Sequence, residues 1–199
     1  MNKLIILAIF LVSAMISVAQ SQVSTDSDAH LTFKGVPIDG TLSEYVSKME
    51  KNGFTHIGTE DGVAMLKGDF AAYKDCIVGV ATLEQKDLVS RITVLFPEYD
   101  TWSPLSSNYF TLKEMLTEKY GEPSDCVEKF QTDFKPKDDN SKMHEVIMNR
   151  CKYYTTYETE KGSIQLSIEP DGVISGFVML AYYDKINYGI IRAKAKDDL

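Results

Sequence analysis

The sequence has few of the residues and motifs on which many functional classes depend. Its 199 residues include three cysteines, three histidines, one tryptophan and six prolines. It contains no Cys-x-x-Cys pair, no His-Glu-x-x-His motif, no glycine-rich phosphate loop and no Gly-x-Ser-x-Gly turn. Common zinc, nucleotide and serine-hydrolase signatures are therefore absent from the sequence. We predict no catalytic residue, no metal site and no cofactor.

Positive charge is also scarce. The chain has 21 Lys and Arg against 29 Asp and Glu, which gives a net charge of −8. Nucleic-acid binding requires clustered basic residues that displace counterions from phosphates, and no such cluster occurs, so we expect no nucleic-acid partner. The contents of 44% hydrophobic and 25% charged residues are typical of a folded globular domain.

The one long hydrophobic run is Leu4–Ala19, which follows the basic residue Lys3. Its roughly 16 residues would make a helix about 24 Å long, shorter than the ~30 Å hydrocarbon core of a bilayer. Ser17-Val18-Ala19 fits the small-x-small pattern of a cleavage site. We predict a signal peptide over residues 1–19 that is cleaved after Ala19. The mature chain would be periplasmic or secreted, with no membrane span, and its residues 20–30 would be a disordered leader.

Residues 31–189 are expected to form a single α+β domain. Thr41 and Glu44 form a capping box before an amphipathic helix that ends near Gly53. Ser103-Pro104 is expected to begin a second helix, which Gly121 ends. Residues 135–142 are predicted to be an exposed loop, and residues 190–199 a short tail that forms a frayed helix rather than a recognition motif. The runs typical of strands are Phe54–Gly58, Val63–Phe70, Cys76–Leu83, Leu88–Phe96, Asp125–Gln131, Val146–Thr156, Ser163–Ile168 and Val173–Tyr182.

These elements predict two helices packed on one face of an antiparallel sheet. Each half, about 31–100 and 101–189, contains a helix followed by four strands, which suggests a tandem repeat. An offset of 85 residues aligns Cys76–Phe96 with Lys161–Ala181 and places Ile92 on Phe177. The alternative is that any two amphipathic hairpins share this alternation.

Cysteine provides one position-specific prediction. If Asp125–Gln131 and Val146–Thr156 pair as a hairpin whose tip lies inside Lys137–Asn140, Cys126 and Cys151 face each other. An exported chain could then form a disulfide between them. The alternative is two reduced, buried thiols. Cys76 is expected to be a buried structural thiol.

Tyrosine is abundant, with 11 residues. Tyr153 and Tyr157 share one face of a strand, with Tyr154 on the other, and Tyr182 and Tyr183 end the last strand. Tyrosine offers a large contact area with a polar end, so Tyr153, Tyr157, Tyr182 and Tyr183 are candidates for an interaction face. The alternative is that these rings pack under the helices.

Three segments carry a resemblance to a known family: Phe33–Phe54 (FKGVPIDGTLSEYVSKMEKNGF), Leu112–Pro123 (LKEMLTEKYGEP) and Ile164–Lys185 (IQLSIEPDGVISGFVMLAYYDK). They resemble an exported protein family of Bacteroides and related gut bacteria. The resemblance implies a periplasmic or secreted location and transfers no catalytic residue. In layout alone, the helix-plus-four-strand repeat is similar to the β-lactamase-inhibitor proteins and, for one repeat, to small outer-membrane assembly lipoproteins. Fold does not imply function.

The function expected from the sequence is a non-enzymatic binding or interaction protein of the bacterial cell envelope, with a protein partner. A carrier of a small apolar or glycan ligand is the alternative, and it requires an enclosed pocket. An unrecognised hydrolase is a third interpretation, which requires ionisable residues that converge in a cleft.

Overall fold

A computed structural model describes residues 29–83, 86–133 and 135–197. The predicted signal peptide and most of the predicted leader lie outside the described residues. The chain is an α+β protein with one large antiparallel sheet. The helices are α1 (Leu42–Lys51), α2 (Trp102–Tyr120), α3 (Asp139–Ile147) and α4 (Lys185–Asp197). The strands of the large sheet are β3 (Thr55–Glu60), β4 (Val63–Phe70), β5 (Tyr73–Leu83), β6 (Lys86–Leu95), β7 (Asp125–Phe130), β8 (Cys151–Thr159), β9 (Gly162–Asp171) and β10 (Ser175–Asp184).

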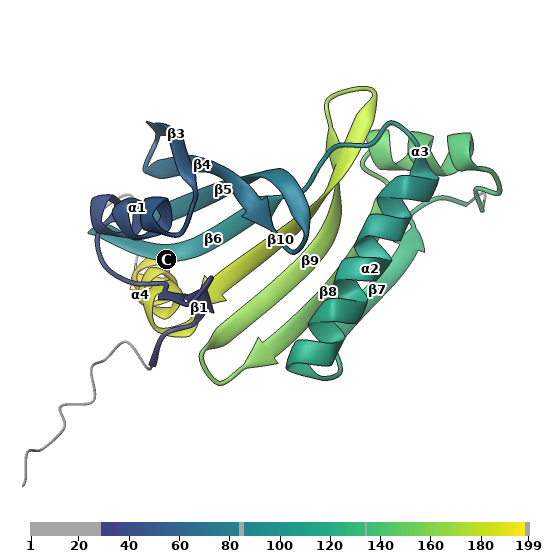
Figure 1. Cartoon of the computed structure of the whole chain (residues 1–199). Coiled ribbons are helices and arrows are strands. Elements are labelled where there is room, and N and C mark those ends of the chain that lie inside the picture. Colours follow the sequence, from purple (N-terminus) through teal and green to yellow (C-terminus); the bar gives the residue numbers. More distant parts are fainter. Residues whose placement is uncertain (1–28, 84–85, 134, 198–199) are drawn as a thin grey trace, which may run out of the picture.

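The eight strands lie in the order β3-β4-β5-β6-β10-β9-β8-β7 (Figure 1). Strands β3–β6 come from the first half of the chain and β7–β10 from the second. The last strand of each half meets the other at the centre, where Leu95 pairs with Met179 and Ile92 with Tyr182. The two halves are therefore joined along a seam between β6 and β10.

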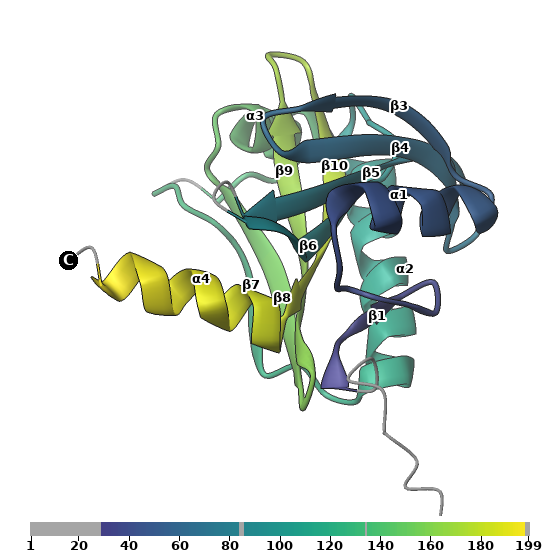
Figure 2. The same ribbon diagram turned by 90° about the vertical axis from the view of Figure 1, so that its left-hand side faces the viewer.

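Helices cover the two faces of the sheet unequally. α1 packs on the strands of the first half, and α2 on β8, β9 and β10. α3 joins α2 on this side, since the position of Gly176 on β10 is close to both Leu105 of α2 and Val146 of α3. Figure 2 shows α4 on the opposite side of the sheet from α1 and α2. We call the side that carries α1 and α2 the inner face, and the other side the outer face.

A short hairpin fills the space beside α1. It consists of β1 (Thr32–Phe33) and β2 (Val36–Pro37), and we call residues 30–39 the N-terminal strap. Phe33 is 1% exposed and its ring lies 5.4 Å from that of Tyr182 on β10. Ile38 is completely buried. The strap is therefore part of the core.

The local signals at the first helix are confirmed. The Thr41 side chain accepts a hydrogen bond from the backbone N–H of Glu44, and the Glu44 side chain accepts one from the N–H of Thr41. Gly53 follows the helix with φ +89°, a conformation that favours glycine. The second helix ends before Gly121 as predicted, but it begins at Trp102 with Thr101 at the N-cap, two residues earlier than the predicted N-cap Ser103.

The predicted count of two helices is wrong, because the described residues contain four. α3 occupies part of the predicted loop 135–142, where Asp138 caps the helix by accepting from the N–H of Ser141. Residues 190–197, predicted as a tail with a frayed helix, are the later part of α4, which begins already at Lys185.

The alignment at an offset of 85 residues is also wrong. Ile92 is completely buried on the inner face, whereas Phe177, which the offset places on it, is partly exposed on the outer face. The inner residues are even-numbered on both β6 (Ile92, Val94) and β10 (Val178, Leu180), so an odd offset places inner residues on outer ones.

Candidate functional site

The outer face of the sheet has a row of apolar side chains at its centre. The register places seven residues of seven neighbouring strands across from one another: Lys67, Ile77, Leu95, Met179, Ser167, Tyr154 and Val127. The three central members, Ile77, Leu95 and Met179, are partly exposed. We call these three residues, together with the neighbouring and partly exposed Met65 and Phe177, the outer apolar patch.

The inner face provides the comparison. The adjacent row of paired residues, displaced by one residue on each strand, points to the inner face. It contains Leu66, Val78, Val94, Leu180 and Leu166, which are at most 1% exposed. The central members of both rows are apolar, but the inner ones are fully buried under the helices, whereas Ile77, Leu95 and Met179 are only partly buried. Burying apolar area from water is favourable by about 25 cal/mol per Å², so the outer apolar patch has binding energy that the fold does not use.

α4 borders the outer face at one end. Its Tyr188 ring lies 5.2 Å from the ring of Tyr183, an outer-face residue of β10. Tyr188 is 37% exposed and Ile186 is 41% exposed. Among the described helices, α4 is the one that projects to this side of the sheet (Figure 2).

The four predicted interface tyrosines do not form one surface. Tyr157 and Tyr182 are 1% and 4% exposed and lie in the core, so these two positions were wrongly assigned to an interaction face. The Tyr157 hydroxyl donates to the carbonyl oxygen of Lys113 at 3.0 Å. Burial raises the pKa of Tyr182. These two rings pack under the helices, as the alternative interpretation expected.

The other two tyrosines lie on opposite faces. Tyr153 is on the inner face, where its ring lies 5.1 Å from Trp102 and 5.5 Å from Phe130. Tyr183 is on the outer face beside α4. The prediction that Tyr153 and Tyr157 share a face is confirmed, but that face is the covered one.

The predicted Cys126–Cys151 disulfide is absent, and the cysteines are free. Cys126 pairs with Thr155, and Cys151 pairs with Phe130, at opposite ends of the β7–β8 ladder. The predicted register is wrong because α3 lies between the two strands, so that they are not joined by a short hairpin tip. Burial, with smaller contributions from Glu169 and Glu145, raises the pKa of the Cys151 thiol to about 12. Cys76 is 1% exposed, as predicted.

Cys126 belongs to a polar cluster at the edge of the inner face. Lys113 Nζ of α2 lies 3.2 Å from Cys126 Sγ and 2.5 Å from Glu128 Oε1. The Cys126 thiol lies 3.5 Å from the same Glu128 oxygen and 3.6 Å from Thr155 Oγ1. Partial burial acts to lower the pKa of Lys113, but its hydrogen bonds to Glu128 and Cys126 outweigh this effect and raise it. We call Lys113, Cys126 and Glu128 the thiol cluster.

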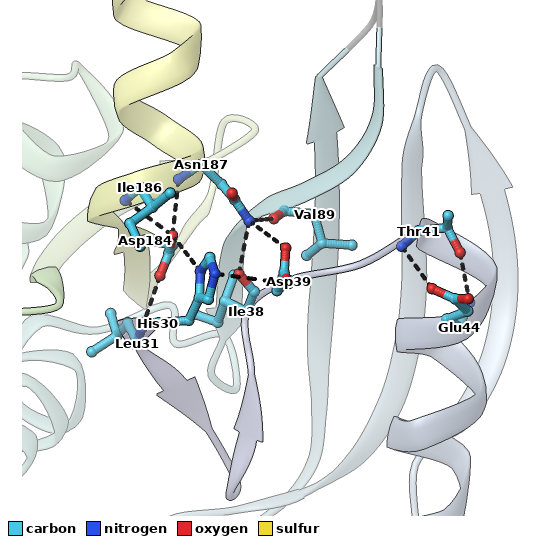
Figure 3. A network of polar contacts seen from close by, with 10 residues as sticks. All are labelled: His30, Leu31, Ile38, Asp39, Thr41, Glu44, Val89, Asp184, Ile186 and Asn187. Carbon is cyan, nitrogen blue, oxygen red and sulfur yellow. Dashed lines mark hydrogen bonds and ion pairs between the residues drawn. The ribbon is translucent and has the colours of Figure 1, made fainter. Parts of the chain in front are cut away.

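A second polar network joins the N-terminal strap to α4 (Figure 3). Asp184 is completely buried and accepts hydrogen bonds from the backbone N–H groups of Leu31, Ile186 and Asn187 at 2.8, 3.1 and 2.9 Å. His30 Nδ1 lies 3.0 Å from the same carboxylate. Asp184 therefore caps α4 and binds the strap with the same two oxygens.

Asn187 extends this network to the sheet. Its side-chain amide contacts the carbonyl oxygens of Ile38 and Val89 and the carboxylate of Asp39, at 2.9–3.1 Å (Figure 3). Burial acts to raise the pKa of Asp39, but the hydrogen bond from Asn187 and other contacts lower it. His30 is 4% exposed, so the predicted disordered leader ends before it.

The His30 network has two carboxylates beside an imidazole but is closed to solvent at its centre. Asp184 is inaccessible, and each of its oxygens is engaged by backbone donors. No serine, threonine or cysteine side chain is among the contacts made by His30 in the described structure. The arrangement is therefore that of a structural network linking the strap to α4, and it lacks the nucleophile that a catalytic base would activate.

The described surface has a hollow of about 550 Å³ beside the end of β7, lined by Lys129, Phe130, Gln131, Thr132, Asp133 and Arg150. It is open and mostly polar, which does not match the enclosed apolar pocket that a small-ligand carrier needs. Within the described ranges, no three or more His, Cys, Asp or Glu side chains are grouped to hold a metal ion. No described helix is long and apolar enough to cross a membrane.

Sequence reasoning did not identify the outer apolar patch, the thiol cluster or the Asp184 network. The patch residues alternate with core residues on the same strands, and both sets are apolar, so the sequence does not show which set the helices cover. The thiol cluster joins residues of α2 and β7, and the network joins residues more than 150 positions apart. Comparison with known proteins adds no assignment: no family model, curated protein or solved structure matches the chain.

Proposed function

We propose that the chain is an exported, non-enzymatic binding protein of the cell envelope that holds a partner protein on the outer face of its sheet. The observation that carries the proposal is the outer apolar patch, whose central residues Ile77, Leu95 and Met179 are partly exposed on a face that α1, α2 and α3 leave uncovered. Export rests on the predicted signal peptide over residues 1–19.

The composition of the outer face suggests the chemistry of the partner. The central row is apolar, while Lys67 on the first-half side and Glu158 and Lys152 on the second-half side are exposed and charged. Charges of both signs surrounding an apolar centre are typical of a protein–protein interface, with a dry core and a polar rim. A partner segment with apolar side chains, flanked by charges, would complete this arrangement.

A tandem repeat of the fold is part of the same proposal. α1 followed by β3–β6 and α2 followed by β7–β10 have the same order, except that α3 is inserted in the second half. The seam between β6 and β10 lies at the centre of the outer apolar patch, since it pairs Leu95 with Met179. A duplicated unit would therefore have formed the binding face by joining its two copies.

A site-specific photo-crosslinker tests the proposal. Placed at Met179 in cells of the natural host, it should join the chain to a distinct partner protein. The same crosslinker at Phe110, which is 45% exposed on α2, is the matched control. The partner should then be purified and its affinity measured for the wild-type chain and for Met179→Glu.

We expect Met179→Glu to weaken the purified complex at least about tenfold, because a charge buried at an apolar interface loses its hydration. Phe110→Glu should leave the affinity unchanged. Circular dichroism must show that both variants are folded. Equal cross-linking at the two positions, cross-links only between copies of this chain, or full affinity of Met179→Glu would each refute the proposal.

A further inference from the structure

The thiol cluster is the strongest unassigned arrangement of reactive side chains outside the outer face. It brings the amino group of Lys113 and the thiol of Cys126 together from two separate elements, α2 and β7. Lys113 Nζ donates a hydrogen bond to Cys126 Sγ at 3.2 Å. Glu128 contacts both groups.

The surrounding contacts fix this geometry. The Tyr157 hydroxyl donates to the carbonyl oxygen of Lys113 at 3.0 Å, which anchors this turn of α2 over the sheet. On the strand side, Tyr109 and Thr155 share a hydroxyl–hydroxyl hydrogen bond of 2.5 Å next to Cys126. Tyr157 thus holds the backbone at Lys113, and Tyr109 holds the strand residue beside Cys126. These buried tyrosines keep the amine and the thiol close together.

Of the three cysteines, Cys126 is the accessible one. It is exposed, whereas Cys76 is 1% exposed and Cys151 is partly buried. A solvent-borne oxidant therefore reaches Cys126 first. The nearest group able to react with its oxidised form is the amine of Lys113.

We propose that Lys113 and Cys126 form a covalent sulfur–nitrogen cross-link when the protein meets hydrogen peroxide. The site is thus a modification site, in which oxidation of one thiol joins α2 covalently to the edge strand β7. It is independent of the function proposed for the outer face, since it lies at the other side and edge of the sheet.

The chemistry has two steps. In the first, the Cys126 thiol gives its proton to Glu128, the sulfur attacks one peroxide oxygen and the O–O bond breaks, and Glu128 passes the proton on to the departing hydroxide. This produces a sulfenic acid and one water. Sulfur loses two electrons, and the peroxide gains them.

In the second step the Lys113 ammonium gives one proton to Glu128, which leaves a lone pair on Nζ. Nζ attacks Sγ, the S–O bond breaks, and the hydroxide leaves as water with a second proton from the nitrogen. Overall, one thiol, one amine and one peroxide give one S–N bond and two waters. The one remaining hydrogen stays on the nitrogen.

The test exposes the purified folded chain to a small excess of hydrogen peroxide and analyses it by mass spectrometry. The wild type should lose about two mass units, and a trypsin digest should contain a peptide that links Lys113 to Cys126. Since trypsin does not cleave at a modified lysine, the linked peptide should also lack cleavage after Lys113. Dithiothreitol should reverse the change.

Two variants separate the cross-link from simple thiol oxidation. Lys113→Arg keeps the cation beside Glu128 but has no comparable nucleophile, so its sulfenic acid should persist and be captured by dimedone. Cys151→Ser should cross-link like the wild type. The proposal is overturned if wild type and Lys113→Arg capture dimedone equally, or if peroxide produces only a disulfide-linked dimer or a sulfinic acid.

Discussion

Replacing Asp184 by alanine should cost about 3–7 kcal/mol of folding free energy. The lost N-cap of α4, which accepts from the N–H groups of Ile186 and Asn187, is worth about 1 kcal/mol. Two more donors, the backbone N–H of Leu31 and His30 Nδ1, lose a buried charged acceptor, and each such loss is worth about 1–3 kcal/mol. Domains are stable by about 5–15 kcal/mol, so the loss is large but measurable.

Urea unfolding, followed by the fluorescence of the single, buried Trp102, measures this quantity. The matched control is Asp171→Ala, which removes an exposed carboxylate at the end of β9 that is remote from Asp184. It should change stability by less than about 0.5 kcal/mol. Hydrogen exchange adds a local measurement, because the Leu31 amide should lose protection in Asp184→Ala. A loss below about 1 kcal/mol, or an equally protected Leu31 amide, would refute the role assigned to Asp184.

Three further results are expected. Gly162→Ala should destabilise the chain by more than about 2 kcal/mol in urea unfolding, because the added Cβ would lie 2.1 Å from the carbonyl oxygen of Tyr183; a neutral effect would contradict the β9–β10 geometry. The hydrogen bond and charge of Arg150 lower the pKa of Glu145. The pair therefore stabilises the fold above the ordinary carboxyl pKa, and this stabilisation is lost as the pH falls through the lowered pKa. Glu145→Gln should flatten that part of the stability–pH curve, and an unchanged curve would count against the pair. Cys126 should react with iodoacetamide well before the two other thiols in a timed peptide map, whereas equal rates would contradict their burial.

Local signals in the sequence predicted many of the elements. Val63–Phe70 was predicted with the bounds observed for β4, and the capping box at Thr41 correctly marked the start of α1. Both depend on neighbouring residues alone: turn residues bound the strand, and a side chain three positions away caps the helix. Such signals do not need knowledge of the tertiary fold.

Missing one short helix, α3, also spoiled the pairing of the two strands on either side of it. Polar residues dominate 135–142, but Asp138 caps a helix whose Met143 and Val146 lie in the core. A helix that buries so few residues has a weak pattern, and missing it shifted the β7–β8 register by four residues. The disulfide prediction depended on that register, so the one local error removed the only position-specific prediction.

The tyrosines illustrate a different limit. Alternation correctly placed Tyr153 and Tyr157 on one face, but it does not say which face the helices cover. That choice depends on the packing of α2, whose residues are about 40 positions away from Tyr157. The sequence therefore predicted which residues share a face, and not which face is free to bind.

The contact between the strap and α4 has a consequence for how the chain reaches its native state. Leu31 and Asp184 are separated by 153 positions, so the hydrogen bond between them closes a loop that includes nearly the whole domain. Contacts of such high sequence separation form late and slow the folding of a domain. During synthesis, residues 30–39 leave the ribosome long before their partners in β10 and α4. Until β10 has been made, Phe33 can pack on Phe54 and Phe70 but lacks its contact with Tyr182, so the strap completes its packing only when the second half has folded.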